Sequence, residues 1–229
     1  MEFNDFKLSK VVLEFRYNDG FLYWDNCGAT ILEIRKNFPE WKWEGTSTEL
    51  SIFREVKNKI ELLFNINYIR YTQDEVDNLN QLKKAATEIT PIILNHLKIA
   101  TFSRVGNRFY YHFRTENVEE GKKIIEEAKL IEIPDKKMEL FGNDSKKISF
   151  VLYIEDINKQ YRFELTTIER KERPGIERIN EKFFPKYGLR ADIDFAIINE
   201  VNALDFSYND FIQHNFKFLE NNLVKLIKK

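Results

Sequence analysis

Segments in which apolar and polar residues alternate occur in clusters along this chain. A long segment with apolar residues at helical spacing follows each cluster. Alternation through 11–17 predicts a half-buried strand. Further strands are expected at 41–44, 48–56, 59–71, 99–115 (a strand or a hairpin), 146–155, 159–171 and 189–198. Clustered strands separated by helices favour an α+β fold over regular βαβ winding. We therefore expect antiparallel or mixed β-sheets packed against two long helices.

The two long helices are predicted from their apolar stripes and from their capping residues. The segment 72–75 has the spacing of a capping box, which predicts a helix over 76–97. Pro91 falls inside this helix and is expected to kink or split it. Ser207 is expected to cap a terminal helix whose apolar stripe extends through 212–226.

The organisation of the chain indicates one domain. Shorter helices are expected at 25–35, 117–130 and 176–185. No internal repeat or linker rich in Pro, Gly or Ser is found. We expect a single compact unit, 1–229, and the pattern leaves open two similar-sized halves, 1–130 and 146–229.

Composition excludes several classes of protein. The chain has 229 residues, with 36 Lys+Arg against 37 Asp+Glu, and this balance argues against nucleic-acid binding over the whole surface. The single cysteine excludes an intrachain disulfide and a zinc site built from cysteines. No apolar run approaches the roughly 18 residues of a spanning helix, and no signal segment opens the chain. We expect a cytoplasmic protein with no membrane partner.

Motifs for catalysis are scarce. The eight glycines form no phosphate-binding loop and no nucleophile elbow. Three histidines and one cysteine leave few groups for nucleophilic catalysis. No cofactor is expected, and an enzymatic role is left open without being favoured.

A basic and aromatic strand is the most suggestive local feature. Between 102 and 114, one parity carries polar side chains that would share a sheet face: Arg104, Arg108, Tyr110, His112 and Arg114. Arginines that hold phosphates beside aromatic rings that stack bases are typical of sheet-based binders of single-stranded nucleic acid. The alternative is that these arginines pair with Asp and Glu on adjacent strands. A bulge at Gly106 would instead scatter the shared face.

An acidic pair lies on a later strand. Asp192 and Asp194 alternate with apolar residues, so both carboxylates would point to one face. Such a pair, with His214 as a further ligand, suggests a metal-dependent phosphodiesterase or nuclease. The alternative is structural: a solvated face, or carboxylates bound by Arg190 and nearby arginines.

Several short segments occur in a characteristic order: Val-Val-Leu-Glu-Phe-Arg at 11–16, Asn-Phe-Pro at 37–39, Arg-Val-Gly-Asn-Arg-Phe at 104–109, Asp-Ile-Asp at 192–194, and His214 followed by Phe216 and Phe218. In these segments the chain resembles a sporadically distributed family of bacterial proteins with no established activity. The resemblance implies recurring positions at Arg104, Gly106, Arg108, Asp192, Asp194 and His214. The patchy distribution of that family implies antiviral defence or toxin–antitoxin systems.

These features lead to a functional hypothesis. We expect a non-enzymatic bacterial interaction protein that binds a protein partner or a second copy of itself. Aromatic residues suggested as interface anchors are Trp24, Trp41, Trp43, Tyr110 and Tyr208. The nucleic-acid-binding strand and the metal-dependent hydrolase remain the two alternatives.

Overall fold

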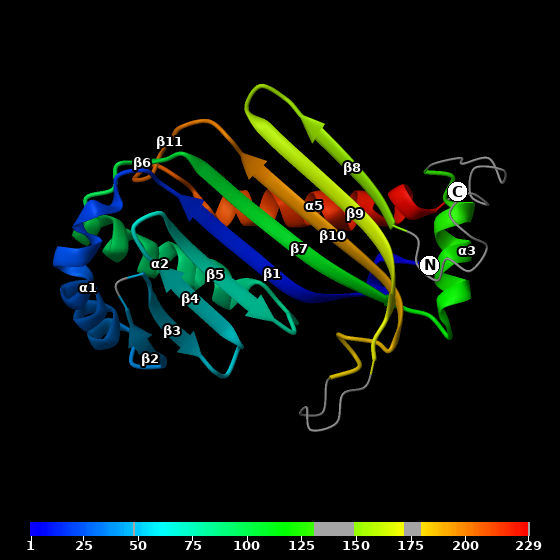
Figure 1. Cartoon of the computed structure of the whole chain (residues 1–229), viewed down its shortest axis with the longest axis horizontal. Helices are drawn as coiled ribbons and strands as arrows, with labels where there is room; N and C mark the ends of the chain where they lie inside the picture. The colour runs from blue at the N-terminus through cyan, green and yellow to red at the C-terminus, as the bar shows by residue number, and fades with distance from the viewer. Residues whose placement is uncertain (48, 131–148, 172–179, 229) are drawn as a thin grey trace.

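The computed structural model describes residues 1–47, 49–130, 149–171 and 180–228, and within them the expected α+β fold is confirmed. A nine-stranded antiparallel sheet forms the body of the molecule, and a small two-stranded sheet accompanies it. Figure 1 shows the long strands side by side, with helices α2 and α5 behind them. All the pairings within the large sheet are antiparallel.

The first part of the chain builds one edge and half of the centre of the large sheet. Its elements are β1 (Phe6–Arg16), α1 (Tyr23–Asn37), β2 (Trp41–Thr46), β3 (Ser51–Glu55), β4 (Ile60–Phe64), β5 (Tyr68–Asp74) and α2 (Asn80–Leu97). Short 3₁₀ helices, Phe3–Asp5 and Gly20–Leu22, precede β1 and α1.

The second part repeats the same order of strand, helix, strands and long helix. Its elements are β6 (Thr101–Phe102), β7 (Arg104–Arg114), α3 (Val118–Glu127), β8 (Ser149–Glu155), β9 (Lys159–Glu169), β10 (Tyr187–Ile197), β11 (Val201–Asn202) and α5 (Tyr208–Ile227). Strands β6 and β11 pair as the small sheet.

The strand order of the large sheet is β2-β3-β4-β5-β1-β7-β10-β9-β8. The first strand that each part contributes to the large sheet, β1 or β7, therefore lies at its centre, where the two pair with each other. Each is flanked on its other side by the last strand of its own meander, β5 or β10. The two parts share one continuous sheet. Residues 131–146, the interval between the two expected halves, lie outside the described residues, so the sub-domain boundaries remain a prediction.

The core lies between one face of the sheet and helices α2 and α5. On β7, Phe109 is fully buried and packs its ring against Phe195 of β10 and Phe216 of α5. On α2, the buried stripe includes Leu82, Ile89 and Ile93. We call the opposite side of the sheet the open face, and no described helix covers it.

The strand expected over 59–71 is wrong as a single strand, because the chain turns at 65–67 to form the β4–β5 hairpin. The Asn65 side-chain oxygen accepts hydrogen bonds from the backbone N–H groups of Asn67 (2.8 Å) and Tyr68 (2.9 Å). An asparagine that bonds the backbone two residues ahead nucleates a turn. The turn at Asn65 was not predicted because strand-like residues continue on both sides of it.

The predicted start of α2 is also wrong. Residues 72–74 belong to β5, and the helix begins at Asn80. The N–H groups of Glu75 and Val76 donate to the backbone oxygens of Ser9 and Leu8 on β1, so they need no capping box. Pro91 does not split the helix. It lies on the exposed side of α2, where water can satisfy the carbonyl that lacks a donor.

Other local expectations are confirmed. Strands β8 and β9 form a hairpin around 156–158, and the Ser207 side chain caps α5 by accepting from the N–H of Asp210. Of the helix expected at 176–185, residues 180–185 are not helical, with a turn at 181–183, and the rest lies outside the described residues. No helix in the described part of the chain is long and apolar enough to span a membrane.

We expect Phe109→Ala to lower the free energy of unfolding by about 3–5 kcal/mol, because it removes a ring that joins β7, β10 and α5. Urea unfolding measures this loss. Phe21→Ala is the control, since Phe21 is 65% exposed, and equal losses for the two variants would contradict the packing described above.

Candidate functional site

The basic and aromatic residues of β7 lie on the open face as one row. Pairing of β7 with β10 is continuous from Val105 to Arg114, so Gly106 forms no bulge. The irregularity lies instead in β1, where the register shifts between Leu8 and Lys10. The row therefore keeps one parity along the whole strand.

Arg108 is held by a buried carboxylate on the neighbouring strand β10. Its Nε and Nη2 atoms donate to the two oxygens of Asp192, each over 2.6 Å, and Asp192 is 2% exposed. The hydrogen bonds from Arg108 to Asp192 raise the pKa of the guanidinium above its usual value. The guanidinium also lies over the ring of Tyr110, 4.9 Å from its centre. Arg108 is thus a partner of Asp192 and of Tyr110.

Glu14 is a second buried carboxylate, at the centre of the sheet on β1. It accepts hydrogen bonds from Nε of Arg16 (2.6 Å) and Nε of Arg70 (2.7 Å), and Arg104 lies 3.7 Å away. Burial raises the pKa of Glu14, but the hydrogen bonds from Arg16 and Arg70 outweigh burial, and the pKa falls below its usual value. Glu14 is therefore a charged centre shared by arginines of three strands.

Arg104 bridges this centre to Asp194. Its Nη2 donates to Asp194 over 2.9 Å, while Nη1 faces Glu14. The guanidinium lies against Gly106, where an added Cβ would stand 2.3 Å from Nη1. Burial raises the pKa of Asp194 against the opposing effect of Arg104 and Arg108. A side chain at 106 would therefore require the Arg104 guanidinium to shift from its present position.

The network extends to the outer strands. Arg162 of β9 bonds Glu164 and lies 3.5 Å from Asp192, and Arg190 of β10 donates to Glu164 over 3.2 Å. Arginines and carboxylates thus alternate across β5, β1, β7, β10 and β9, which is the ion-paired alternative considered above. We call these residues the open-face network: Glu14, Arg16, Arg70, Arg104, Arg108, Arg162, Glu164, Arg190, Asp192 and Asp194.

The remaining β7 residues do not extend a flat platform for bases. Tyr110 is half-buried, and burial raises the pKa of its hydroxyl. His112 is buried beneath the 180–186 segment, and its Nδ1 bonds the backbone oxygen of Phe183 over 2.8 Å. Burial lowers the pKa of His112 to about 4. Arg114 is exposed at the end of the strand.

The acidic pair has arginine partners in place of a metal-ligand set. Asp192 and Asp194 are bonded by Arg108 and Arg104, while His214 is exposed on α5, on the other side of the sheet. Among the described residues, no three His, Cys, Asp or Glu side chains gather in a way that would hold a metal ion.

Sequence reasoning missed Glu14, Arg70, Arg162 and Glu164. Glu14 and Arg16 have the same parity on β1, but only the pairing of β1 with β5 and β7 brings the other arginines to Glu14. Among the suggested anchors, Trp41 and Tyr208 are wrong because both are buried in the core, while Trp24 and Trp43 are exposed.

The chain matches no model of a known protein family. A search of curated proteins likewise finds no similar sequence. The resemblance described above, with the bacterial defence setting that it implies, therefore stays a prediction. Five of its six recurring positions, all except His214, meet at the open-face network.

We expect Arg108→Ala to lower the free energy of unfolding by about 3–5 kcal/mol, because it leaves the Asp192 carboxylate buried without its main partner. Urea unfolding measures the loss. Arg54→Ala is the matched control: its pairs with Glu44 and Glu61 are exposed, so a loss below about 1 kcal/mol is expected. A similar small loss for both would show that Arg108 is not structural.

His112 predicts a defined pH dependence of stability. Its pKa is about 4 in the folded state against 6.5 for the unperturbed group, so the unfolded chain binds more protons between these values. This stabilisation is complete above pH 6.5 and is lost as the pH falls towards 4. The free energy of unfolding falls by about 2–3 kcal/mol over this range.

Urea unfolding near pH 7 and near pH 4.5 measures this effect in wild type and in His112→Asn, which keeps a donor near Nδ1. The variant should lose the His112 part of the pH dependence, while His214→Asn should keep it because His214 is exposed. An unchanged pH dependence in His112→Asn would exclude a neutral, buried His112.

Proposed function

We propose that this protein is a self-associating interaction protein in which strand β8 pairs, edge to edge, with β8 of a second copy. The observation that carries this proposal is the chemistry of β8. It is an edge strand of the large sheet, and no described strand pairs with its outer side.

Strand β8 is apolar and exposed on both of its faces. Val151 and Tyr153 point to the open face, and Leu152 and Ile154 point to the helix side, as their partners on β9 show. These four side chains are between 38% and 54% exposed. No described helix packs over Leu152 or Ile154, so both faces of this strand expose apolar area that a soluble edge would normally hide.

The opposite edge of the same sheet is built differently. Strand β2 carries Lys42 and Glu44 and has a register irregularity between Trp43 and Gly45. Charges and bulges are the usual protection of an edge against pairing with another chain. Within β8, the only charged residue is Glu155, at its end. The contrast between the two edges of one sheet supports β8 as the pairing edge.

The sequence of β8 is complementary to itself. In an antiparallel pair related by a two-fold axis through Leu152, this residue faces its own copy, Phe150 faces Ile154, Val151 faces Tyr153, and Ser149 faces Glu155. Aromatic residues opposite branched aliphatic ones are favourable cross-strand pairs, and no like charges meet. In a closed two-fold dimer the β8 edges of both copies are paired, so neither is left exposed. These features favour a second copy as the occupant.

The open-face network argues against the alternative of nucleic-acid binding. Its arginines are paired with carboxylates in the structure, so they are not poised to hold the phosphates of a nucleic acid. Association by backbone pairing and apolar contact does not require these charges.

Size-exclusion chromatography with light scattering tests the proposal. At concentrations up to about 1 mM, where even a weak dimer is populated, wild type should reach twice the chain mass of 27.5 kDa. Val151→Lys and Ile154→Lys, one on each face of β8, should be monomeric because a charge is placed in the paired edge.

Val56→Lys is the control, since Val56 is also exposed but lies outside the strands of the described sheet. It should remain dimeric. A monomeric wild type at the highest concentration, or a dimer that survives both β8 substitutions, would exclude pairing through β8. Binding of another protein in place of a second copy would also overturn the proposed occupant.

A further inference from the structure

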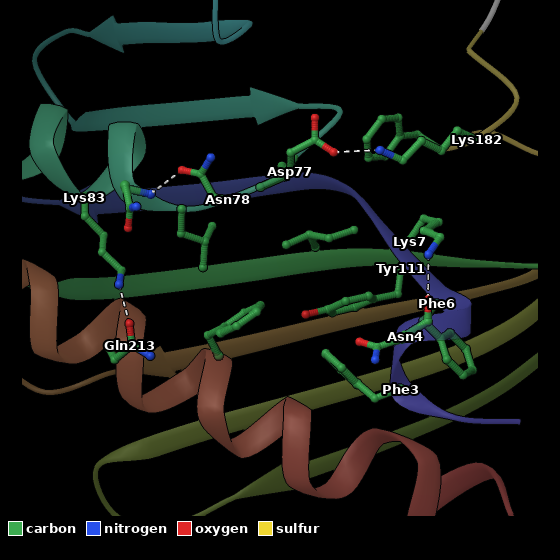
Figure 2. A pocket seen from close by; sticks show the side chains of 16 residues that line it. Phe3, Asn4, Phe6, Lys7, Asp77, Asn78, Lys83, Tyr111, Lys182 and Gln213 are labelled. Carbon is green, nitrogen blue, oxygen red and sulfur yellow. Dashed lines mark hydrogen bonds and ion pairs between the residues drawn. The ribbon is translucent and has the colours of Figure 1, made fainter.

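A cavity of about 510 Å³ lies on the helix side of the sheet, away from both the open face and β8. It is bounded by the start of α2, by α5, by the first residues of the chain and by the 182–183 segment. Figure 2 shows side chains from all these elements pointing inward. Its volume is in the range of small-molecule sites.

The floor of this cavity is apolar, with one polar group in it. Phe3, Leu79 and Phe216 are among the apolar lining residues. Tyr111 of β7 lies among them, 1% exposed, with its hydroxyl directed towards the other lining side chains (Figure 2). Among the described residues this hydroxyl has no hydrogen-bond partner. A buried hydroxyl without a partner is costly, so its direction into a cavity points to a ligand that supplies one.

Positive charge surrounds the rim. The lining includes Lys7, Lys83 and Lys182 but only one carboxylate, that of Asp77. Lys182 pairs with Asp77 over 2.7 Å. Lys83 bonds the neutral side chain of Gln213, and Lys7 bonds the backbone oxygen of Asn4. Two cations at this cavity therefore have no carboxylate partner among the described residues.

The first turn of α2 adds to this field. The helix begins at Asn80 without a side-chain cap from Leu79, and it has no acidic residue in its first turn. Asn80 N–H is bonded by the side-chain oxygen of Asn78. A helix of 18 residues presents partial positive charge at its start, and here no carboxylate of the helix offsets it.

We infer that this cavity binds a small organic carboxylate with an apolar body. The carboxylate lies near Lys83 and the start of α2, and the body lies against the apolar floor. The Tyr111 hydroxyl donates a hydrogen bond to the ligand. A purely apolar ligand leaves the lysines unused, and a bare inorganic anion leaves the apolar floor uncovered. This site is separate from β8 and does not depend on the proposed dimer.

Titration calorimetry with sodium octanoate tests the inference, with 1-octanol as the neutral counterpart. Octanoate should bind saturably with a dissociation constant below about 1 mM, and octanol should bind about tenfold more weakly. Lys83→Gln should weaken octanoate binding about tenfold by removing the unpaired cation. Lys84→Gln is the matched control, because the neighbouring Lys84 is exposed and pairs loosely with Glu88.

Tyr111→Phe separates ligand binding from folding. Because it removes an unpartnered buried hydroxyl, it should leave the melting temperature unchanged or raised, yet weaken octanoate binding about fivefold. The inference is overturned by any of three results: no saturable octanoate binding, equal affinity for octanol, or displacement of octanoate by inorganic phosphate at equal concentration. Equal effects of Lys83→Gln and Lys84→Gln would overturn the placement of the carboxylate.

Discussion

Two buried carboxylates, Glu14 and Asp192, determine how the centre of the sheet is built. An ionised carboxylate buried without a partner would cost a large share of the stability of a domain. Arginines of neighbouring strands meet this requirement: Arg70 and Arg104 from β5 and β7 for Glu14, and Arg108 and Arg162 from β7 and β9 for Asp192. The same contacts connect five adjacent strands. A slip of one residue in any pairing would separate these charges, so the network also specifies register.

This arrangement divides the molecule by task. The helix side of β1 and β7 provides the core, and the open face carries the network of ion pairs. The two places that we propose for binding, the β8 edge and the cavity beneath the start of α2, contain none of the residues of this network. The repeated order of elements places β2 and β8 at corresponding edges, yet only β2 carries the usual protection against pairing.

Much of the fold is predictable from local patterns, because alternation and helical stripes report burial directly. The strands at 11–17 and 189–198 and the capped terminal helix are of this kind. The turn at Asn65 and the late start of α2 were not predicted, since both depend on which backbone groups find hydrogen-bond partners. The shared face of Arg104 and Arg108 followed from parity, but their carboxylate partners did not. Partners such as Glu14 are fixed by strand order, which short-range pattern does not contain.

Gly106 illustrates how a missing side chain can serve a charged one. The Arg104 guanidinium occupies the space that a Cβ at 106 would take, and from there it reaches both Glu14 and Asp194. Substitutions at 104 and 106 are therefore not independent of each other in evolution. Once Arg104 is lost, the space beside 106 is free for a side chain, and once 106 has a side chain, a restored Arg104 must place its guanidinium elsewhere. When both positions have changed, a restored Arg104 can take up its present place only after glycine has returned at 106.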